Sequence, residues 1–402
     1  MSSSTTSSVR HRHVFYVPGY DPFHPRRYRE LYRSESAEQG QISGYDIAIS
    51  RAKSGGLYGW NVDAKIEGQD TKTTVEVLYW SDLVRDSMKG GVIETYQRLI
   101  KTAWIYINTG ALFRLAKLRK GPVIAALYPV GFLLLQLVIA LCAAWGLGKI
   151  LSFLNPLLHW AGLIVVPFIL GWFRKNDNRF YAYYLMQDYA YSAGERGAYP
   201  PELEGRMDEF VNEIARALAS DVDEVLVVGH SSGAYLAVTI LADLLRQNDS
   251  EKWKAELSFL SLGHVVPMVS FLPMADKLRG DLQYLCEREE LVWVDVTAPS
   301  DGGTFALCDP VAVTGVATEN KRWPLVLSAA YTQTLSPEKW QSMRWRFFKL
   351  HIQYLCAFDR PGDYDYFQIT AGPQTLSRRY RDRASSPSRI ERATSGYRGV
   401  GS

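Results

Sequence analysis

The chain has 402 residues, of which 47% are apolar and 22% are charged, a composition that is typical of a globular protein and excludes a disordered or collagen-like chain. Lys and Arg total 45 and Asp and Glu total 42, a net charge of +3, so the charge gives no reason to expect nucleic-acid binding. The four cysteines lie far apart: Cys142, Cys286, Cys308 and Cys356. This spacing argues against a zinc ribbon or a disulfide scaffold and favours a reducing, cytosol-facing environment.

The first 80 residues are predicted to contain a polar tail and two strands. Residues 1–12 are polar and show no apolar pattern, so we expect a disordered tail there. The sequence HVFYVPGY at 13–20 predicts a buried strand that ends in a Pro-Gly turn. The sequence TVEVLYW at 74–80 is rich in β-branched and aromatic residues and predicts a second strand.

An amphipathic helix is predicted just before the most apolar part of the chain. Apolar residues recur at helical spacing from Val92 to Ile107. One interpretation is an ordinary helix packed on a soluble core. The other is a helix at the membrane–water boundary, where Trp104, Tyr106 and Arg114 would be well placed.

The region 121–173 consists of two uncharged stretches that are separated only by Lys149. Each is long enough to cross the hydrocarbon core, which takes about 20 apolar residues. The gap between them, at 146–155, is short, so we predict a transmembrane helical hairpin with both ends on one side. A buried helical cap in a soluble enzyme would show polar faces at helical spacing, and this region shows almost none. A shallow re-entrant hairpin is a further alternative, because Asn155 and Pro156 interrupt the second stretch.

Both flanks of this predicted hairpin are basic. Arg114, Lys117, Arg119 and Lys120 precede it, and Arg174, Lys175 and Arg179 follow it. By the positive-inside rule, flanks of this kind lie in the cytoplasm. We therefore expect an integral membrane protein whose soluble part faces the cytoplasm and whose partners include the lipid bilayer.

The chain after the hairpin alternates between predicted helices and strands. Helices are predicted at 202–220, 232–247, 274–287 and 338–355, and strands at 223–229, 257–262, 291–296 and 323–327. Such alternation predicts a mainly parallel sheet with helices on both faces. The final segment, 373–402, is rich in Ser, Gly and Arg. We expect it to be a basic, disordered tail, which is either simply solvated or attracted to anionic cytoplasmic lipids.

The strongest chemical signal is the sequence Gly229-His230-Ser231-Ser232-Gly233, which lies between a predicted strand and a predicted helix. A serine hydroxyl is a poor nucleophile unless it projects from a sharp turn and has a base beside it. Small residues two positions before and after the serine relieve the crowding in such a turn. We therefore predict that Ser231 is a nucleophile, against the alternative of a Gly-rich turn with chance serines.

In this setting the GHSSG sequence resembles the GHSxG motif of the α/β-hydrolase superfamily, which includes lipases, esterases and thioesterases. The resemblance implies an α/β-hydrolase fold, a mainly parallel sheet flanked by helices, into which the two-helix transmembrane hairpin is inserted. It covers 13–120 and 174–372, the expected first and second parts of the hydrolase domain. It says nothing about the hairpin at 121–173, which is not expected at this place in the family.

The resemblance also implies the chain order nucleophile, acid, histidine. The acid is expected in the loop after the strand at 291–296, where Asp301 lies, with Asp295 and Asp309 as alternatives. His351 is the one histidine after Asp301 in the sequence, and it is therefore assigned as the base.

The oxyanion hole that the resemblance implies would use two backbone N–H groups. One is that of Ser232, directly after the nucleophile, and the other is that of Tyr20, in the loop after the first strand. In this loop the usual His-Gly dipeptide of the family is replaced by Pro18-Gly19, which weakens the match but keeps the turn-forming glycine.

Together these features predict a membrane-anchored serine hydrolase that cleaves an ester or thioester, with an acyl or lipid-like substrate. Ser231, His351 and Asp301 would form the catalytic triad and pass through an acyl-enzyme. The alternatives are an acyltransferase that uses the same acyl-enzyme and a catalytically silent membrane interaction module. No Walker motif, dinucleotide fingerprint or metal-ligand cluster occurs in the sequence, so no cofactor is implied. The sequence does not indicate an oligomeric state.

Overall fold

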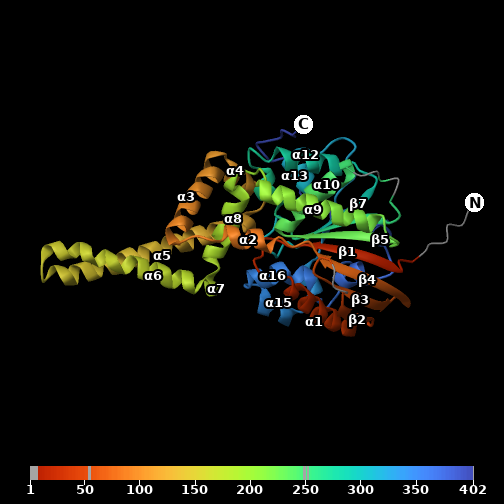
Figure 1. The fold of residues 1–402 in the computed structure, drawn as a ribbon, viewed down its shortest axis with the longest axis horizontal. Helices are drawn as coiled ribbons and strands as arrows, with labels where there is room; N and C mark the ends of the chain where they lie inside the picture. Colours follow the sequence, from red (N-terminus) through yellow and green to blue (C-terminus); the bar gives the residue numbers. More distant parts are fainter. Residues whose placement is uncertain (1–7, 53–55, 248–249, 251–252, 402) are drawn as a thin grey trace, which may run out of the picture.

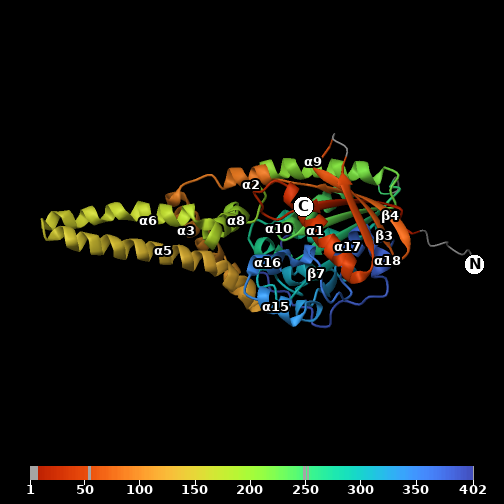
Figure 2. The ribbon, with the colours of Figure 1, turned by 90° about the horizontal axis from the view of Figure 1, so that it is seen from below.

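The computed structural model describes residues 8–52, 56–247, 250 and 253–401. Figure 1 shows a body built around one twisted sheet, from which a long helical hairpin extends to one side. The view at right angles, in Figure 2, shows the same hairpin lying clear of the body.

The sheet has eight strands in the order β2-β3-β4-β1-β5-β6-β7-β8. The strands are β1 (His11–Val17), β2 (Asp46–Arg51), β3 (Gly59–Ile66), β4 (Gln69–Val77), β5 (Glu224–His230), β6 (Glu256–Leu262), β7 (Leu291–Thr297) and β8 (Leu325–Ser328). From β4 through β1 to β8 all neighbours are parallel, whereas β2, β3 and β4 pair antiparallel. The expected mainly parallel sheet is therefore present, with an antiparallel edge that the sequence analysis did not include.

Helices cover both faces of this sheet, as the strand–helix alternation predicts. One face packs against α9 (Pro201–Leu218), α10 (Ser232–Gln247) and α12 (Asp276–Leu285), and the other against α1 (Arg26–Ser43) and the C-terminal helices (Figure 1). The predicted helix at 338–355 is divided into α15 (Pro337–Met343), α16 (Phe347–Ile352) and the 3-10 turn η3 (Gln353–Leu355). The remaining short helices are α2 (Ser81–Ser87), α11 (Val266–Ser270), α13 (Pro310–Thr314), α14 (Tyr331–Thr334), α17 (Tyr366–Ala371) and α18 (Leu376–Arg379).

The hairpin consists of α5 (Lys120–Ser152), a short turn, the 3-10 helix η1 (Pro156–Ile164) and α6 (Val165–Lys175). Both arms, Lys120–Ser152 and Pro156–Lys175, are long and apolar enough to cross a membrane, with mean hydropathies of 2.3 and 1.7. Only 28% and 11% of their most apolar windows are buried, whereas a helix in the core of a soluble protein would be mostly covered. The arms therefore do not form the buried cap that was weighed as an alternative.

Small residues bring the two arms of the hairpin close together. A Cβ added to Gly162 would lie 2.2 Å from the Ala144 carbonyl oxygen, and one added to Gly148 would lie 2.4 Å from the His159 carbonyl oxygen. Ala140, Ala144 and Gly148 are buried at four-residue spacing on the inner face of α5. Close contact through small residues is typical of helices that pack in lipid.

The free part of the hairpin begins later than residue 121. The first half of α5 contacts the body, because Val123 is buried beside α4 (Ala111–Leu118) and Leu133 packs on α8 (Ala182–Gly194). At the foot, the Tyr128 hydroxyl donates to the Phe180 carbonyl at the end of α7 (Asp177–Phe180), 2.8 Å away. The uncharged stretch of sequence therefore includes a section that packs against the body as well as the section that projects from it.

The predicted amphipathic helix is α3 (Val92–Asn108). One of its faces packs on the body, as in the first interpretation, and the other is uncovered, as the second requires. Leu99 and Tyr106 are buried, and the Tyr106 hydroxyl donates to the Met268 carbonyl at 2.9 Å. Tyr106 therefore does not lie at a membrane boundary. The opposite face of the helix stays uncovered, with Ile100 and Trp104 each 67% exposed.

Both expected tails need correction. The segment after residue 372 is not disordered up to residue 401: Ile390 pairs with Cys308, and the Arg279 guanidinium donates to the Gly399 carbonyl at 2.6 Å. At the other end, β1 starts inside the expected tail, and the buried Arg12 pairs with Glu224 at 2.6 Å. Residues 1–7, the rest of that tail, lie outside the described residues. Polar, Arg-rich composition indicated disorder, but these segments are fixed by buried partners far away in sequence.

Candidate active site

Ser231 lies in the sharp turn between β5 and α10, and its backbone has φ of 58°. This is the left-handed region, which costs a residue with a Cβ about 1–3 kcal/mol and is found mainly where function requires it. The Ser231 amide donates to the Leu262 carbonyl at 3.0 Å and its carbonyl accepts from the Ala234 amide at 3.1 Å. These bonds to the end of β6 and the first turn of α10 hold the strained residue in place.

The two glycines of the GHSSG sequence are required by close backbone contacts. A Cβ on Gly233 would lie 2.1 Å from the Val17 carbonyl oxygen, and one on Gly229 would lie 2.8 Å from the Ala234 Cα atom. Gly19, from the loop after β1, is also close, since a Cβ there would lie 3.0 Å from Ser231 Cβ. The turn and the β1 loop are therefore packed so tightly that only glycine fits at these positions.

His351 and Asp301 are hydrogen-bonded to each other. His351 Nδ1 lies 2.9 Å from Asp301 Oδ2, and the Asp301 side chain is fully buried while that of His351 is 21% exposed. Because a carboxylate only accepts, His351 donates from Nδ1, which leaves the Nε2 lone pair free. Burial by itself would lower the pKa of His351, but the charge and hydrogen bond of Asp301, together with the charge of Asp188, raise it above its usual value.

His230 connects the serine turn to His351. Its Nε2 atom lies 2.9 Å from the His351 carbonyl oxygen, and the two rings stack with centroids 4.9 Å apart. Since a carbonyl only accepts, Nε2 donates, and His230 Nδ1 must accept from the Tyr16 hydroxyl at 3.1 Å. Burial and the neighbouring His351 lower the pKa of His230 to about 3, so it is neutral at pH 7. It therefore links the residue before Ser231 to the His351 backbone, a role that the sequence analysis did not assign.

The other two acids considered from the sequence have different partners. Asp295 Oδ1 accepts from the Ser261 hydroxyl at 2.6 Å, and Asp295 Oδ2 lies 3.6 Å from His264 Nε2. Asp309 caps α13 through its bonds to the Val311 and Ala312 amides and pairs with Lys321 at 2.6 Å. Of the three acids, the structure brings only Asp301 against His351.

The two expected oxyanion donors flank the serine turn. Ser232 is the first residue of α10, so its N–H has no acceptor within that helix. Tyr20 follows Gly19, which contacts Ser231. Tyr20 is held at both its side chain and its backbone, because its hydroxyl lies 2.6 Å from that of Ser87 and its backbone carbonyl accepts from the Tyr184 hydroxyl.

Asp188 is a charged group of the site that the sequence analysis missed. It lies on the same face of α8 as Tyr184 and Ser192. Tyr184 bonds to the Tyr20 carbonyl, and the Ser192 hydroxyl lies 3.4 Å from that of Tyr235 on α10. Burial raises the pKa of Asp188 to about 7, and the charge of His351 opposes this shift. Within the described residues the two side chains share no hydrogen bond, so the interaction is one of charge. No motif includes Asp188, because only packing of α8 over the turn brings it near.

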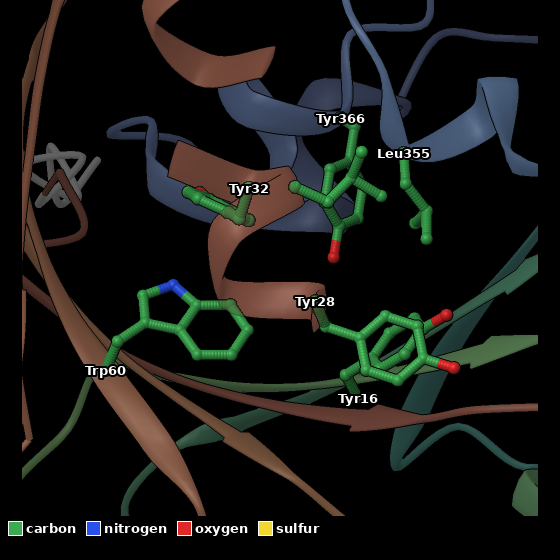
Figure 3. A pocket seen from close by; sticks show the side chains of 7 residues that line it. Tyr16, Tyr28, Tyr32, Trp60, Leu355 and Tyr366 are labelled. Atoms are coloured by element: carbon green, nitrogen blue, oxygen red, sulfur yellow. The ribbon is translucent and has the colours of Figure 1, made fainter. Parts of the chain in front are cut away.

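A small aromatic cavity lies beside Tyr16, whose hydroxyl bonds to His230 (Figure 3). It is lined by Tyr16, Tyr28, Leu31, Tyr32, Trp60, Leu355 and Tyr366 and has a volume of about 10 Å³. That is room for about one water molecule. The cavity is too small for a substrate, but the Tyr16 hydroxyl joins it to His230.

The described residues contain no group of three or more His, Cys, Asp or Glu side chains that is arranged to hold a metal ion. The arrangement instead provides a strained serine, a histidine with a free ring nitrogen and a buried carboxylate that orients it. Comparison of the chain with protein-family models, curated proteins and solved structures gave no match.

Proposed function

We propose that this protein is a membrane-anchored serine hydrolase of the α/β-hydrolase type, which cleaves an ester or thioester with a lipid-like acyl chain. The observation that supports this best is the strained backbone of Ser231, which has φ of 58° in the turn between β5 and α10. The residue before it, His230, bonds to the His351 backbone. His351 is in turn oriented by Asp301 at 2.9 Å. Nucleophile, base and orienting acid are the parts that acyl transfer through a serine requires.

In the proposed reaction, Ser231 Oγ attacks the substrate carbonyl carbon while its proton passes to His351 Nε2. Asp301 stays ionised and stabilises the imidazolium. The oxyanion accepts hydrogen bonds from the Ser232 and Tyr20 amides. The protonated His351 then gives its proton to the leaving oxygen or sulfur, and water, activated by the same histidine, releases the acid from the acyl-enzyme.

The membrane part of the proposal rests on the uncovered apolar surface of the hairpin. Phe153, Leu154 and Leu157 at its tip are 80–89% exposed. Exposure of these apolar side chains is unfavourable in free energy in water but not in lipid. The free part of α5, about 16 residues beyond Gln136, is roughly 24 Å long at 1.5 Å per residue. That is slightly less than the hydrocarbon core of about 30 Å, so an apolar tip that stays within the bilayer fits the proposal. The basic flanks favour a cytoplasmic body.

A fluorophosphonate probe tests the proposed chemistry, because it reacts only with an activated serine. We expect the detergent-solubilised, full-length protein to gain one probe adduct, located by peptide mass spectrometry at Ser231. Heat-denatured protein is the control and is expected to gain none. An intact protein that gains no adduct, or gains it at another serine, would contradict the proposed function.

Replacement of Asp188 by asparagine is expected to move the pH dependence of hydrolysis. Among the described residues, the charges of Asp301 and Asp188 act on His351, and the rings of the neutral His230 and of Tyr354 lie near it. Asp188 raises the pKa of His351, so its removal lowers that pKa, and the acidic limb of kcat/KM for an uncharged ester should shift to lower pH.

Glu195→Gln is the matched control for this prediction. Glu195 is exposed at the end of the same helix, and its loss removes one negative charge without changing the site. Its pH profile should coincide with that of the wild type. An unshifted acidic limb in the Asp188→Asn enzyme would show that the Asp188 carboxylate does not act on the base.

A further inference from the structure

The segment Arg344–Lys349, with the sequence RWRFFK, is exposed at all six positions. Trp345 is 76% exposed, Phe347 57% and Phe348 40%. Three aromatic and three basic side chains therefore face outward from the break between α15 and α16. No acidic residue lies within the segment, so the net charge of these six residues is +3.

This segment lies between the foot of the hairpin and the candidate active site. The Phe348 ring packs on that of Tyr181, which directly follows α7 at the hairpin foot, with centroids 4.4 Å apart. On the other side, Phe347 is in contact distance of Gly302, next to Asp301, since a Cβ on Gly302 would lie 3.5 Å from the Phe347 ring. Figures 1 and 2 both place α16 on the side of the body from which the hairpin emerges.

The composition of the segment matches the surface of an anionic bilayer. Tryptophan and phenylalanine rings are stable among lipid headgroups and upper acyl chains, and arginine and lysine pair with anionic lipid phosphates and carboxylates. The basic residues at the hairpin foot, Arg174, Lys175 and Arg179, are exposed on the same side. A second copy of this chain would be a poor partner, because it would bring two segments of charge +3 together.

We propose that Arg344–Lys349 is a membrane-surface binding element, which docks on the anionic headgroups of the bilayer that holds the hairpin. This inference rests on the membrane part of the proposed function and not on its chemistry. Since α16 also carries His351, docking of the segment would hold this part of the candidate site close to the lipid surface. Substrate would then pass from the bilayer to the site without crossing water.

The test is a fluorescent label at position 345 in the full-length protein. The two cysteines that are not buried, Cys142 and Cys356, are replaced by alanine, and Trp345→Cys is labelled with nitrobenzoxadiazole. The protein is reconstituted into phosphatidylcholine vesicles with or without phosphatidylserine. We expect a blue-shifted emission, protection from iodide and quenching by spin-labelled lipid, each stronger in the vesicles that contain phosphatidylserine.

Two matched variants make the result specific. Gln69→Cys, labelled in the same way, is exposed at the first position of β4, a strand on the side of the body away from the hairpin (Figures 1 and 2), and should show none of these changes. Arg344→Gln with Arg346→Gln should weaken binding of the label to the anionic surface by about fivefold per arginine. The label reports binding whether or not the protein hydrolyses esters, so failure of this inference and failure of the proposed chemistry are separate results.

Equal iodide access at positions 345 and 69 in phosphatidylserine vesicles would overturn the proposal. Protection from iodide without quenching by spin-labelled lipid would also overturn it, because the segment would then be covered by protein, such as a second copy. Lipid contact that is equal in both kinds of vesicle and unaffected by the two arginine replacements would show that the anionic headgroups are not the ligand.

Discussion

Replacement of Ser231 by alanine is expected to abolish both ester hydrolysis and fluorophosphonate labelling. The hydroxyl is the only protein group in the proposed mechanism that forms a bond to the acyl carbon, so its loss should reduce kcat by roughly 10⁴-fold or more. The measurement is the hydrolysis of a short soluble ester by purified full-length protein, together with the probe assay. Membrane association should not change, because the hairpin is untouched.

Ser231→Gly is the informative companion to this variant. Alanine keeps the Cβ and therefore the strain of φ 58°, whereas glycine adopts this conformation freely. Glycine also makes the unfolded chain more flexible, which costs about 0.4–1 kcal/mol, so the net gain is small. We expect the glycine variant to be as inactive as the alanine variant but equally or more resistant to thermal unfolding. Activity that survives in either variant would place the nucleophile elsewhere.

The central part of the candidate site could be predicted because it depends on local sequence. A strand, a turn with fixed glycines and a helix are short-range features, and the order serine, acid, histidine left few choices after Ser231. The position of Asp301 in the loop after a predicted strand favoured it as the acid, but the sequence left Asp295 and Asp309 open. The choice depends on which carboxylate reaches His351, and only Asp301 does so in the structure.

Asp188 and His230 show what sequence patterns cannot provide. The importance of Asp188 comes from the packing of α8 over the serine turn, and α8 directly follows the hairpin in the chain. His230 lies within the motif, but its role depends on a carbonyl 121 residues away. Contacts of this range are set by the tertiary fold, and no periodicity in the sequence encodes them.

The fold shows the same division between local and distant causes. Buried strands such as β5 are apolar throughout and were predicted with nearly correct bounds. The strand β3, between β2 and β4, was missed although it alternates buried and more exposed residues, with Trp60, Val62 and Ile66 facing the core. The alternation was a usable signal there. The ordered C-terminal segment had no such signal, because Gly399 is fixed by Arg279 on α12.

Removal of the projecting part of the hairpin is expected to release the protein from membranes. The structure indicates where to cut: residues 137–169 are replaced by a short Gly/Ser linker between Gln136 and Leu170, which keeps the buried Leu133 and Leu170 in place. In the proposed arrangement each arm buries a continuous apolar surface in lipid, an attachment that is effectively irreversible. Full-length protein should therefore stay with membranes through high salt and alkaline washing and dissolve only in detergent.

Without the projecting part of the hairpin, only weaker interfacial contacts would hold the body to a membrane, chiefly the segment Arg344–Lys349 and the basic residues at the hairpin foot. Each basic residue there contributes about 1 kcal/mol at an anionic surface, and salt screens this attraction. The truncated protein should thus sediment with anionic vesicles at low salt and be released at high salt. Because Ser231, His351 and Asp301 lie in the body, it should still hydrolyse a soluble ester at the wild-type rate but cleave vesicle-embedded substrate more slowly. If full-length protein is itself removed from membranes by salt, the apolar arms are not inserted in lipid, and their exposed surface must then be covered by protein.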